Sequence, residues 1–463
     1  MQPDIINNCL IVFNSYRDLN LDRAQEILKY EFENKYNKKI DLHLKKMLEP
    51  AGIRGNLPGY LSAYARLREE IPEKELDEYD SIIFIHDAGL ATRLFPLTYE
   101  SGSPLKSTIR FPDGFAVEIL FTCIAKHLPL IKGAVVILPV DQYFEYTSID
   151  KDALNYCLEN YTLSMLLTPV PIKRALHSLG TVKLGNDNKI DGFLEKTNDE
   201  SNIFKYSKES TLANTFQLIT TMDNLKKLHA AFALFLSKPE NDVFITQLDQ
   251  TEWSFNELVC EALTLPKEDL SDAQIAMKTA LNKIGITLGG VIANGFWEDW
   301  SSNITAYIEL LKKLVKKNEK SSGNDNYFVR SRKIVASGNL KSCIFIDCDT
   351  IDLFGDFENC IFVNCDWVRM ISAEKAENAL FYSLKKINFL RRDMSNYVYS
   401  RFISGRRHID FECEINVNLK QIYTTMNKVS SDWVKYHEVV ENPPTLHSDS
   451  NAPMGRPPRE YNR

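Results

Sequence analysis

The chain has 463 residues, of which 44% are hydrophobic and 25% are charged, and its formal net charge is −7. This length exceeds one compact core and predicts two or three domains of an ordinary globular protein. The acidic balance argues against a protein that coats nucleic acid or an anionic membrane, and the apolar runs are too short to span a bilayer. The N-terminus lacks the basic region of a signal peptide, and the nine cysteines favour reduced thiols in a cytoplasmic protein rather than a disulfide framework.

Residues 1–78 are predicted to form a helical extension. Apolar residues recur at three- and four-residue spacing in 21–36 and 42–48, and again in 57–71. No catalytic pattern stands out in this segment. We therefore interpret it as an added cap or as an oligomerisation element, which is compatible with a homo-oligomer.

Strand and helix patterns alternate over residues 79–318. The apolar run IIFIH is followed by AVEILFTCIAKHL, GAVVILPV, DALNYCLENY and LSMLLTPV. This alternation predicts an α/β domain with a doubly wound, mostly parallel sheet that binds its ligands at the carboxyl ends of the strands. The polar stretch KNEKSSGNDN then indicates a linker.

An internal repeat follows the linker. SCIFIDC at 342–348 is echoed by NCIFVNC at 359–365 and more weakly by NALFYSL at 378–384. Offsets of 17 and 19 residues suit one coil of a β-solenoid, which we expect over residues 327–440. The proline-rich, polar residues 441–463 are expected to be a disordered tail.

The most informative stretch, residues 81–108, reads SIIFIHDAGLATRLFPLTYESGSPLKST. Residues 82–86 predict a buried parallel strand that runs into a loop of small residues, with Arg93 behind it. The backbone of such a loop can approach an anion and point N–H groups at it, and arginine adds a forked positive charge. The stretch therefore favours a phosphate-binding loop.

The run T-R-L-F-P-L-T, followed by Pro104 and Lys106, resembles the nucleotide-binding signature of the sugar-1-phosphate nucleotidyltransferases. Three positions depart from that signature: Asp87 and Ala91 replace a small residue and a glycine, and Leu105 separates the proline from its lysine. Asp87 brings negative charge to a phosphate loop, which would weaken nucleotide binding unless a metal or Lys106 neutralises it.

The resemblance implies a nucleotide-diphospho-sugar transferase-like fold and an Mg²⁺-dependent reaction of a nucleoside triphosphate with a sugar 1-phosphate. It gives catalytic contacts with the phosphates to Arg93 and Lys106, whose plainer interpretations are a surface salt bridge and a solvated loop lysine. It also implies that one loop binds the nucleotide. That loop consists of Ala88, Gly89, Leu90, Ala91, Thr92 and Arg93.

Two aspartates occupy the positions at which the resembling family binds its metal. Asp141 follows the apolar run 134–140, and Asp299 lies in FWEDW just before the periodic helix pattern at 304–315. Carboxylate oxygens are ligands that Mg²⁺ accepts. The plainer interpretations are a turn or helix-cap residue for Asp141 and a residue that favours a helix N-terminus for Asp299.

Sugar-phosphate contacts are implied for three further residues. Glu195 and Lys196 form an E-K pair at the end of a predicted strand, and Asn214 stands where the family has a sugar-binding asparagine. An exposed E-K pair without a ligand is the plainer alternative for the first two.

Two other function classes stay open. A catalytically inactive, nucleotidyltransferase-like binding or regulatory protein would account for Asp87, Ala91 and the displaced Lys106. A solenoid acyltransferase would need a histidine in the repeats, and none lies there.

Overall fold

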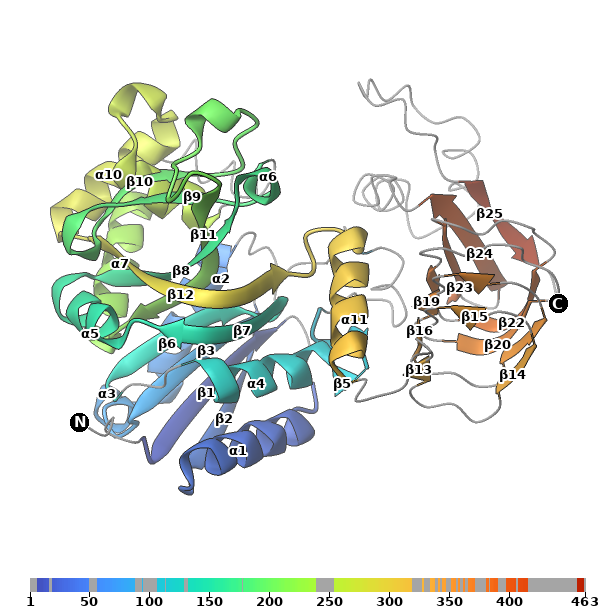
Figure 1. Ribbon diagram of the computed structural model, residues 1–463. Helices are drawn as coiled ribbons and strands as arrows, with labels where there is room; N and C mark the ends of the chain where they lie inside the picture. Colours follow the sequence, from blue (N-terminus) through green and yellow to red (C-terminus); the bar gives the residue numbers. More distant parts are fainter. Residues whose placement is uncertain are drawn as a thin grey trace. The chain divides into compact units, whose positions relative to one another are not determined.

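The chain divides into two units in the computed structural model (Figure 1). The first unit comprises Met1–Gly89 and Val117–Asp299, and the second comprises Leu90–Ala116 and Trp300–Arg463. The structure describes residues 6–15, 19–49, 56–87, 94, 106–112, 114–128, 132–176, 178–238, 254–318, 327–328, 334–337, 340–341, 344–346, 351–354, 357–358, 361–362, 365–370, 380–382, 384–389, 397–404, 407–414 and 456–461.

A mixed ten-stranded sheet forms the centre of the first unit, with the strand order β2-β1-β3-β6-β11-β8-β12-β7 and with β9 and β10 attached beside β11. Its strands are β1 (Asn8–Ser15), β2 (Asp41–Leu48), β3 (Ser81–Asp87), β6 (Ala134–Pro139), β7 (Gln142–Ile149), β8 (Leu163–Pro171), β9 (Thr181–Leu184), β10 (Ile190–Leu194), β11 (Ser210–Thr220) and β12 (Leu288–Asp299). The pairs β1–β2, β1–β3, β3–β6 and β8–β12 are parallel. β11 runs antiparallel to β6 and β8, and β7 antiparallel to β12. The expected α/β fold with a mostly parallel sheet is therefore present.

The first 78 residues differ from the helical extension that their spacing predicts. Strand β1 lies between β2 and β3 in the sheet and pairs with both along its length. The run NCLIVFNS is short and has a continuous apolar centre, as a buried strand does. The run DLHLKKML begins with the polar–apolar alternation of a half-exposed edge strand. The segment is thus part of the α/β unit.

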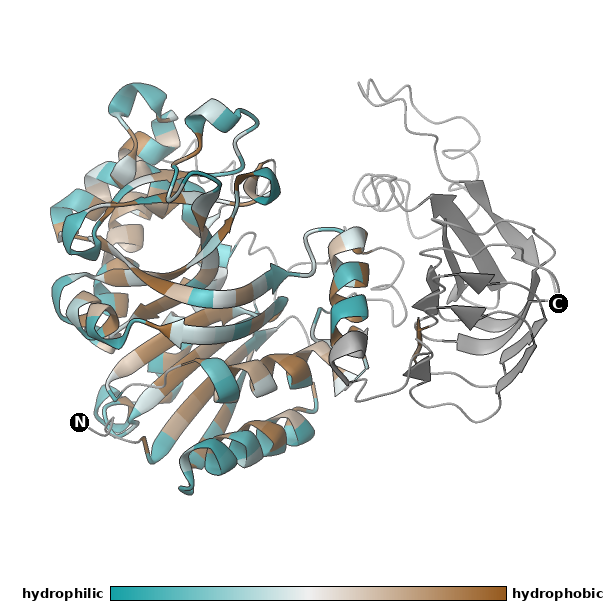
Figure 2. Cartoon of the chain, viewed as in Figure 1, coloured by the Kyte–Doolittle hydropathy of each residue, from teal (hydrophilic) through white to brown (hydrophobic). Residues whose placement is uncertain are grey.

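Helices pack on both faces of this sheet. Alternate residues of β1 show the two faces: Leu10 and Val12 join the core beneath α2, and Ile11 and Phe13 are buried on the opposite face. Figure 2 shows hydrophobic residues concentrated in these strands and hydrophilic residues on α1. The helices are α1 (Asp22–Tyr36), α2 (Asn56–Glu70), α3 (Glu73–Leu76), α4 (Ala116–His127), α5 (Lys151–Asn160), α6 (Ile172–Ala175), η3 (Asn186–Asn188), η4 (Glu200–Asn202), α7 (Met222–Leu236), η6 (Asn256–Glu261), α9 (Ala262–Thr264), η7 (Lys267–Asp269) and α10 (Asp272–Ile284).

Local sequence sets several helix ends. A capping box of Ser271 and Gln274 begins α10, and Gly285, with a φ of 80°, ends it. Asp150 and Thr221 accept backbone N–H bonds at the starts of α5 and α7. No helix among the described residues is long and apolar enough to cross a membrane.

The second unit contains η2 (Lys106–Thr108), α11 (Ile304–Asn318) and mainly short strands. These are β4 (Arg110–Phe111), β5 (Gly114–Phe115), β13 (Tyr327–Phe328), β14 (Ile334–Ser337), β15 (Leu340–Lys341), β16 (Ile344–Phe345), β17 (Ile351–Phe354), β18 (Phe357–Glu358), β19 (Ile361–Phe362), β20 (Cys365–Met370), β21 (Leu380–Tyr382), β22 (Leu384–Phe389), β23 (Tyr397–Ser404), β24 (Arg407–Glu414) and β25 (Arg456–Tyr461). The predicted boundary near residue 318 differs from the division at Asp299, because α11 belongs to this second unit.

The strands of the repeats pair in parallel and in register. Ile344 lies opposite Ile361, which lies opposite Leu380, and Phe362 lies opposite Phe381. Within the segment expected to be a disordered tail, β25 pairs antiparallel with β24, because the edge of β24 offers free backbone partners to it.

Candidate functional site

A cluster of buried polar residues lies where β1, β2 and β3 end. It consists of Asn14 and Ser15 at the end of β1, Glu49 directly after β2, and His86 and Asp87 at the end of β3. Each is at most 7% exposed. The three strands are parallel, so their carboxyl ends meet at one edge of the sheet, where ligands of open α/β sheets bind. We call these five residues the carboxyl-edge cluster.

Short contacts hold the carboxyl-edge cluster together. Ser15 Oγ donates to Asp87 Oδ2 at 3.2 Å, and Asn14 Nδ2 lies 3.2 Å from His86 Nδ1. The Glu49 backbone N–H donates to the Ser15 carbonyl at 2.8 Å. These bonds fix the positions of three neighbouring strand ends relative to one another.

Helix α2 closes one side of the cluster with a glycine. A Cβ placed on Gly59 would lie 2.3 Å from His86 Cε1 and 2.7 Å from Glu49 Oε1. Only a residue without a Cβ therefore allows the imidazole and the carboxylate to approach the helix backbone. The ring of Tyr60, the next residue, lies 4.8 Å from that of His86.

The Glu49 carboxylate is buried without a partner. Both of its oxygens are inaccessible to solvent, and neither accepts a hydrogen bond from the part of the chain that the structure describes. Burial and the neighbouring Asp87 carboxylate raise the pKa of Glu49 to about 8. An unpaired buried carboxylate costs free energy, so its presence at this edge of the sheet makes Glu49 a candidate for ligand binding.

Asp141 and Asp299 meet at the same edge of the sheet. Asp299 ends β12 and lies opposite Gln142, the first residue of β7, and Asp141 directly precedes that glutamine. Antiparallel partners are at most about 5.5 Å apart and successive Cα atoms 3.8 Å, so the Cα atoms of the two aspartates lie within about 9 Å. Asp141 also connects to the carboxyl-edge cluster, since burial and the Asp141 and Glu49 carboxylates together raise the pKa of Tyr60.

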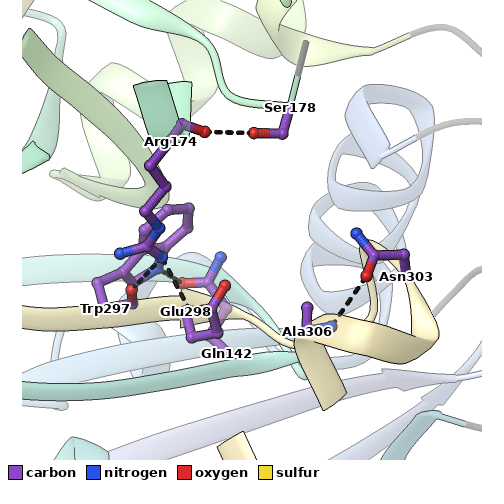
Figure 3. Close-up of polar contacts among 7 residues, drawn as sticks. All are labelled: Gln142, Arg174, Ser178, Trp297, Glu298, Asn303 and Ala306. Carbon is purple, nitrogen blue, oxygen red and sulfur yellow. Dashed lines mark hydrogen bonds and ion pairs between the residues drawn. The ribbon is translucent and has the colours of Figure 1, made fainter. Parts of the chain in front are cut away.

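A directed chain of hydrogen bonds surrounds Gln142. Trp297 Nε1, which can only donate, bonds to Gln142 Oε1 at 3.0 Å (Figure 3). Gln217 Nε2 donates to the same oxygen at 3.1 Å. Tyr146 in turn donates to Gln217 Oε1. The orientation of the Gln142 amide is thereby fixed, and its Nε2 is a buried donor with no partner among the described residues.

Arg174 on α6 places a positive charge beside the end of β12. Its guanidinium donates to the Trp297 carbonyl at 2.7 Å and forms an ion pair with Glu298 at 3.0 Å, as Figure 3 shows. The helix that carries it is held by a Ser178 Oγ bond to the Arg174 carbonyl. The charge therefore lies within two residues of Asp299.

The three residues expected to contact a sugar phosphate lie in one network. Asn214 Nδ2 donates to Asn256 Oδ1 at 2.9 Å, and Asn256 Nδ2 donates to Glu195 Oε2 at 2.8 Å. Lys196 Nζ lies 3.4 Å from Glu195 Oε1. β11 runs antiparallel to β6, with Leu218 opposite Ile137, so Asn214 lies toward the carboxyl end of β6.

Two irregular backbone segments support this network. Phe216 has a φ of 58°, rare for a bulky residue, and its N–H donates to Asn214 Oδ1 at a break in the β11–β8 register. Asn256 begins the π-helix η6, and at its other end Glu261 accepts the Glu195 backbone N–H at 2.9 Å. Strained backbone and π-helices concentrate at functional sites, which makes this network a candidate for ligand binding.

The structure brings together only part of the predicted site. The loop Ala88–Thr92 and Arg93 lie outside the described residues. Lys106 begins η2 in the second unit. Asp141 and Asp299 adjoin in one unit with Glu195, Lys196 and Asn214.

Sequence reasoning singled out Asp87 but missed the other members of the carboxyl-edge cluster and Asn256. Asn14 and Ser15 end an apolar run, and Glu49 ends an alternating one, so recognising β1 and β2 as parallel strands would have identified them. Asn256 has no such signal, because its role depends on contacts with residues 42 and 61 positions away.

No group of three or more histidine, cysteine, aspartate or glutamate side chains within the described residues is arranged to hold a metal. Comparisons of the sequence with models of known protein families and with curated proteins gave no match.

Proposed function

We propose that the protein transfers a nucleotidyl group from a nucleoside triphosphate to a sugar 1-phosphate. The observation that carries this proposal is the register between β7 and β12, which brings Asp141 beside Asp299 at the ligand edge of the sheet. The loop sequence that resembles the sugar-1-phosphate nucleotidyltransferases follows β3, and β3 ends at the same edge.

The reaction requires no protein nucleophile. A phosphate oxygen of the sugar 1-phosphate attacks the α-phosphorus, the bond between the α-phosphorus and the bridging oxygen breaks, and pyrophosphate leaves with that oxygen. The protein needs to hold both substrates in line and to stabilise the charge on the transferring phosphorus. Arg93 and Lys106 supply positive charge to the phosphates in this proposal, and Glu195, Lys196 and Asn214 bind the sugar phosphate.

Asp141 and Asp299 fit a divalent cation, because their backbone positions adjoin and both supply hard oxygen ligands. Mg²⁺ bound there would neutralise phosphate charge during the transfer. Asp141 is 5% exposed, so it is largely shielded from bulk water.

In the second unit we propose a β-solenoid built from the repeats. The parallel pairs Tyr327–Ile344, Ile344–Ile361 and Ile361–Leu380 follow offsets of 17, 17 and 19 residues, as successive coils require.

We also place the protein in the cytoplasm. Among the described residues, Cys9, Cys123, Cys157 and Cys260 are buried thiols, as expected in a reducing compartment.

A regulatory protein that binds ligands without turnover is the second candidate. Asp87 favours it, because this residue is fully buried and directly precedes the loop that resembles a nucleotide-binding loop. A buried carboxylate at that position opposes phosphate binding unless a cation neutralises it.

The test starts with thermal shift of the full chain against nucleoside triphosphates, with and without Mg²⁺. Ligand at a hundred times its dissociation constant should stabilise the native state by about 2.7 kcal/mol. Pyrophosphate release is then measured with a panel of sugar 1-phosphates. Turnover that disappears in Asp299→Asn supports the transferase, and binding without turnover on any sugar 1-phosphate favours the regulatory protein.

A further inference from the structure

We propose that Glu49 and Asp87 hold a divalent cation at the carboxyl ends of β2 and β3, at a site separate from Asp141 and Asp299. The two carboxylates lie at the ends of strands that both pair with β1. Glu49 donates its backbone N–H to Ser15, and Ser15 Oγ donates to Asp87, so one residue fixes both.

The first argument is the unpartnered Glu49 carboxylate. Glu49 is 7% exposed, yet its two oxygens have no hydrogen bond within the described residues, and no lysine or arginine there forms an ion pair with it. A buried carboxylate is normally paired or bound to a metal. Its chemistry therefore points to a positively charged ligand.

The second argument is the shape of the surroundings. Gly59 lets the helix backbone lie against Glu49 Oε1, since a Cβ at this position would stand 2.7 Å from that oxygen. The carboxylate oxygens are closed to solvent, so an occupant of atomic size suits them better than an organic ligand. A metal ion with oxygen bonds of about 2.1–2.6 Å has that size.

The charge of the site favours a divalent over a monovalent cation. Asp87 is fully buried and lies close enough to Glu49 to raise the pKa of that residue. A cation that displaces the Glu49 proton meets two carboxylates, whose two negative charges suit one divalent ion. Mg²⁺ and Mn²⁺ are commonly bound by one or two carboxylates.

The test counts Mn²⁺ ions bound to the full chain by electron paramagnetic resonance of the free ion, without nucleotide and again with a nucleoside triphosphate. We expect Glu49→Gln and Asp87→Asn each to remove one Mn²⁺ equivalent or to weaken it at least tenfold. Asp299→Asn should leave this equivalent in place. The exposed Glu69→Gln on α2 is the matched control.

Three outcomes would overturn the site. They are unchanged Mn²⁺ binding in Glu49→Gln, loss of all bound Mn²⁺ in Asp299→Asn, and no Mn²⁺ bound to the parent chain under either condition. Thermal unfolding of each variant without metal shows whether it is folded, and a misfolded Asp87→Asn leaves the near-isosteric Glu49→Gln to decide. The measurement involves no turnover, so an absent transfer reaction would leave the cation site standing.

Discussion

The buried carboxylate of Glu49 links protonation to stability in the metal-free protein. Its pKa is about 8 in the folded chain against an ordinary value of 4.5, so between these values the folded state holds a proton that the unfolded state has lost. The stability contributed by this group is complete below pH 4.5 and disappears as the pH rises toward 8. Each pH unit in that window costs up to about 1.4 kcal/mol.

Glu49→Gln should remove this slope from the pH dependence of the free energy of unfolding. Urea unfolding in the presence of a chelator, at several pH values between 5 and 8, measures the slope. If the free energy of unfolding varies with pH equally in the variant and the parent, Glu49 is not the source of the slope. The exposed Glu69→Gln should follow the parent.

Asn256 illustrates how a single amide can fix a directed network. The Phe216 N–H occupies Asn214 Oδ1, so Asn214 must donate to Asn256, which then donates to Glu195. Asn256→Ala leaves a donor and an acceptor buried and unpaired, and should lower the free energy of unfolding by about 1–3 kcal/mol.

Asn256→Asp separates positioning from packing. Its carboxylate can still accept from Asn214 but faces Glu195 with like charge, so the pKa of Glu195, already raised by burial, should rise further. Affinity for a sugar 1-phosphate, measured by calorimetry, should fall in the aspartate variant even though that variant remains folded. Equal affinity in the parent and this variant would exclude the role, and the exposed Asn202→Ala serves as the control.

Gly59 on helix α2 should stabilise the protein, although glycine has a low helix propensity. Gly59→Ala in an exposed helix interior would stabilise by roughly 0.5–1 kcal/mol. Here the new Cβ would stand 2.3 Å from His86 Cε1, closer than atoms approach, so we expect a lower melting temperature. Differential scanning calorimetry of Gly59→Ala beside the half-buried Ser62→Ala on the same helix checks this, and a stabilised Gly59→Ala would show that the ring can move aside.

At the scale of the whole molecule, the first two strands belong to the sheet. β1 hydrogen-bonds to both β2 and β3, so deletion of residues 1–49 removes two strands and exposes the edge of β3. We expect the truncated protein to be insoluble or to lack cooperative unfolding by circular dichroism. A removable cap would instead leave the melting temperature nearly unchanged, and that result would contradict the placement of β1.

The sequence by itself determined the features that depend on near neighbours. Apolar runs such as AVVILP predict buried strands, and the alternation with helices predicts the mostly parallel sheet that the structure shows. The repeat offsets likewise anticipate the parallel pairing of Ile344 with Ile361. Local periodicity was ambiguous in DLHLKKML, where apolar spacing suits a helix and alternation suits a strand, and pairing with β1 decided it.

Only the tertiary structure decided which polar groups meet. The adjacency of Asp141 and Asp299 depends on the register of two strands separated by more than 130 residues, and the network of Glu195 depends on Asn256 in a π-helix. The Glu49 carboxylate is isolated because the fold buries it where no described residue donates a hydrogen bond to it. Spacing along a chain records which side chains are available, whereas burial and long-range pairing determine which of them lack a partner and can bind a ligand.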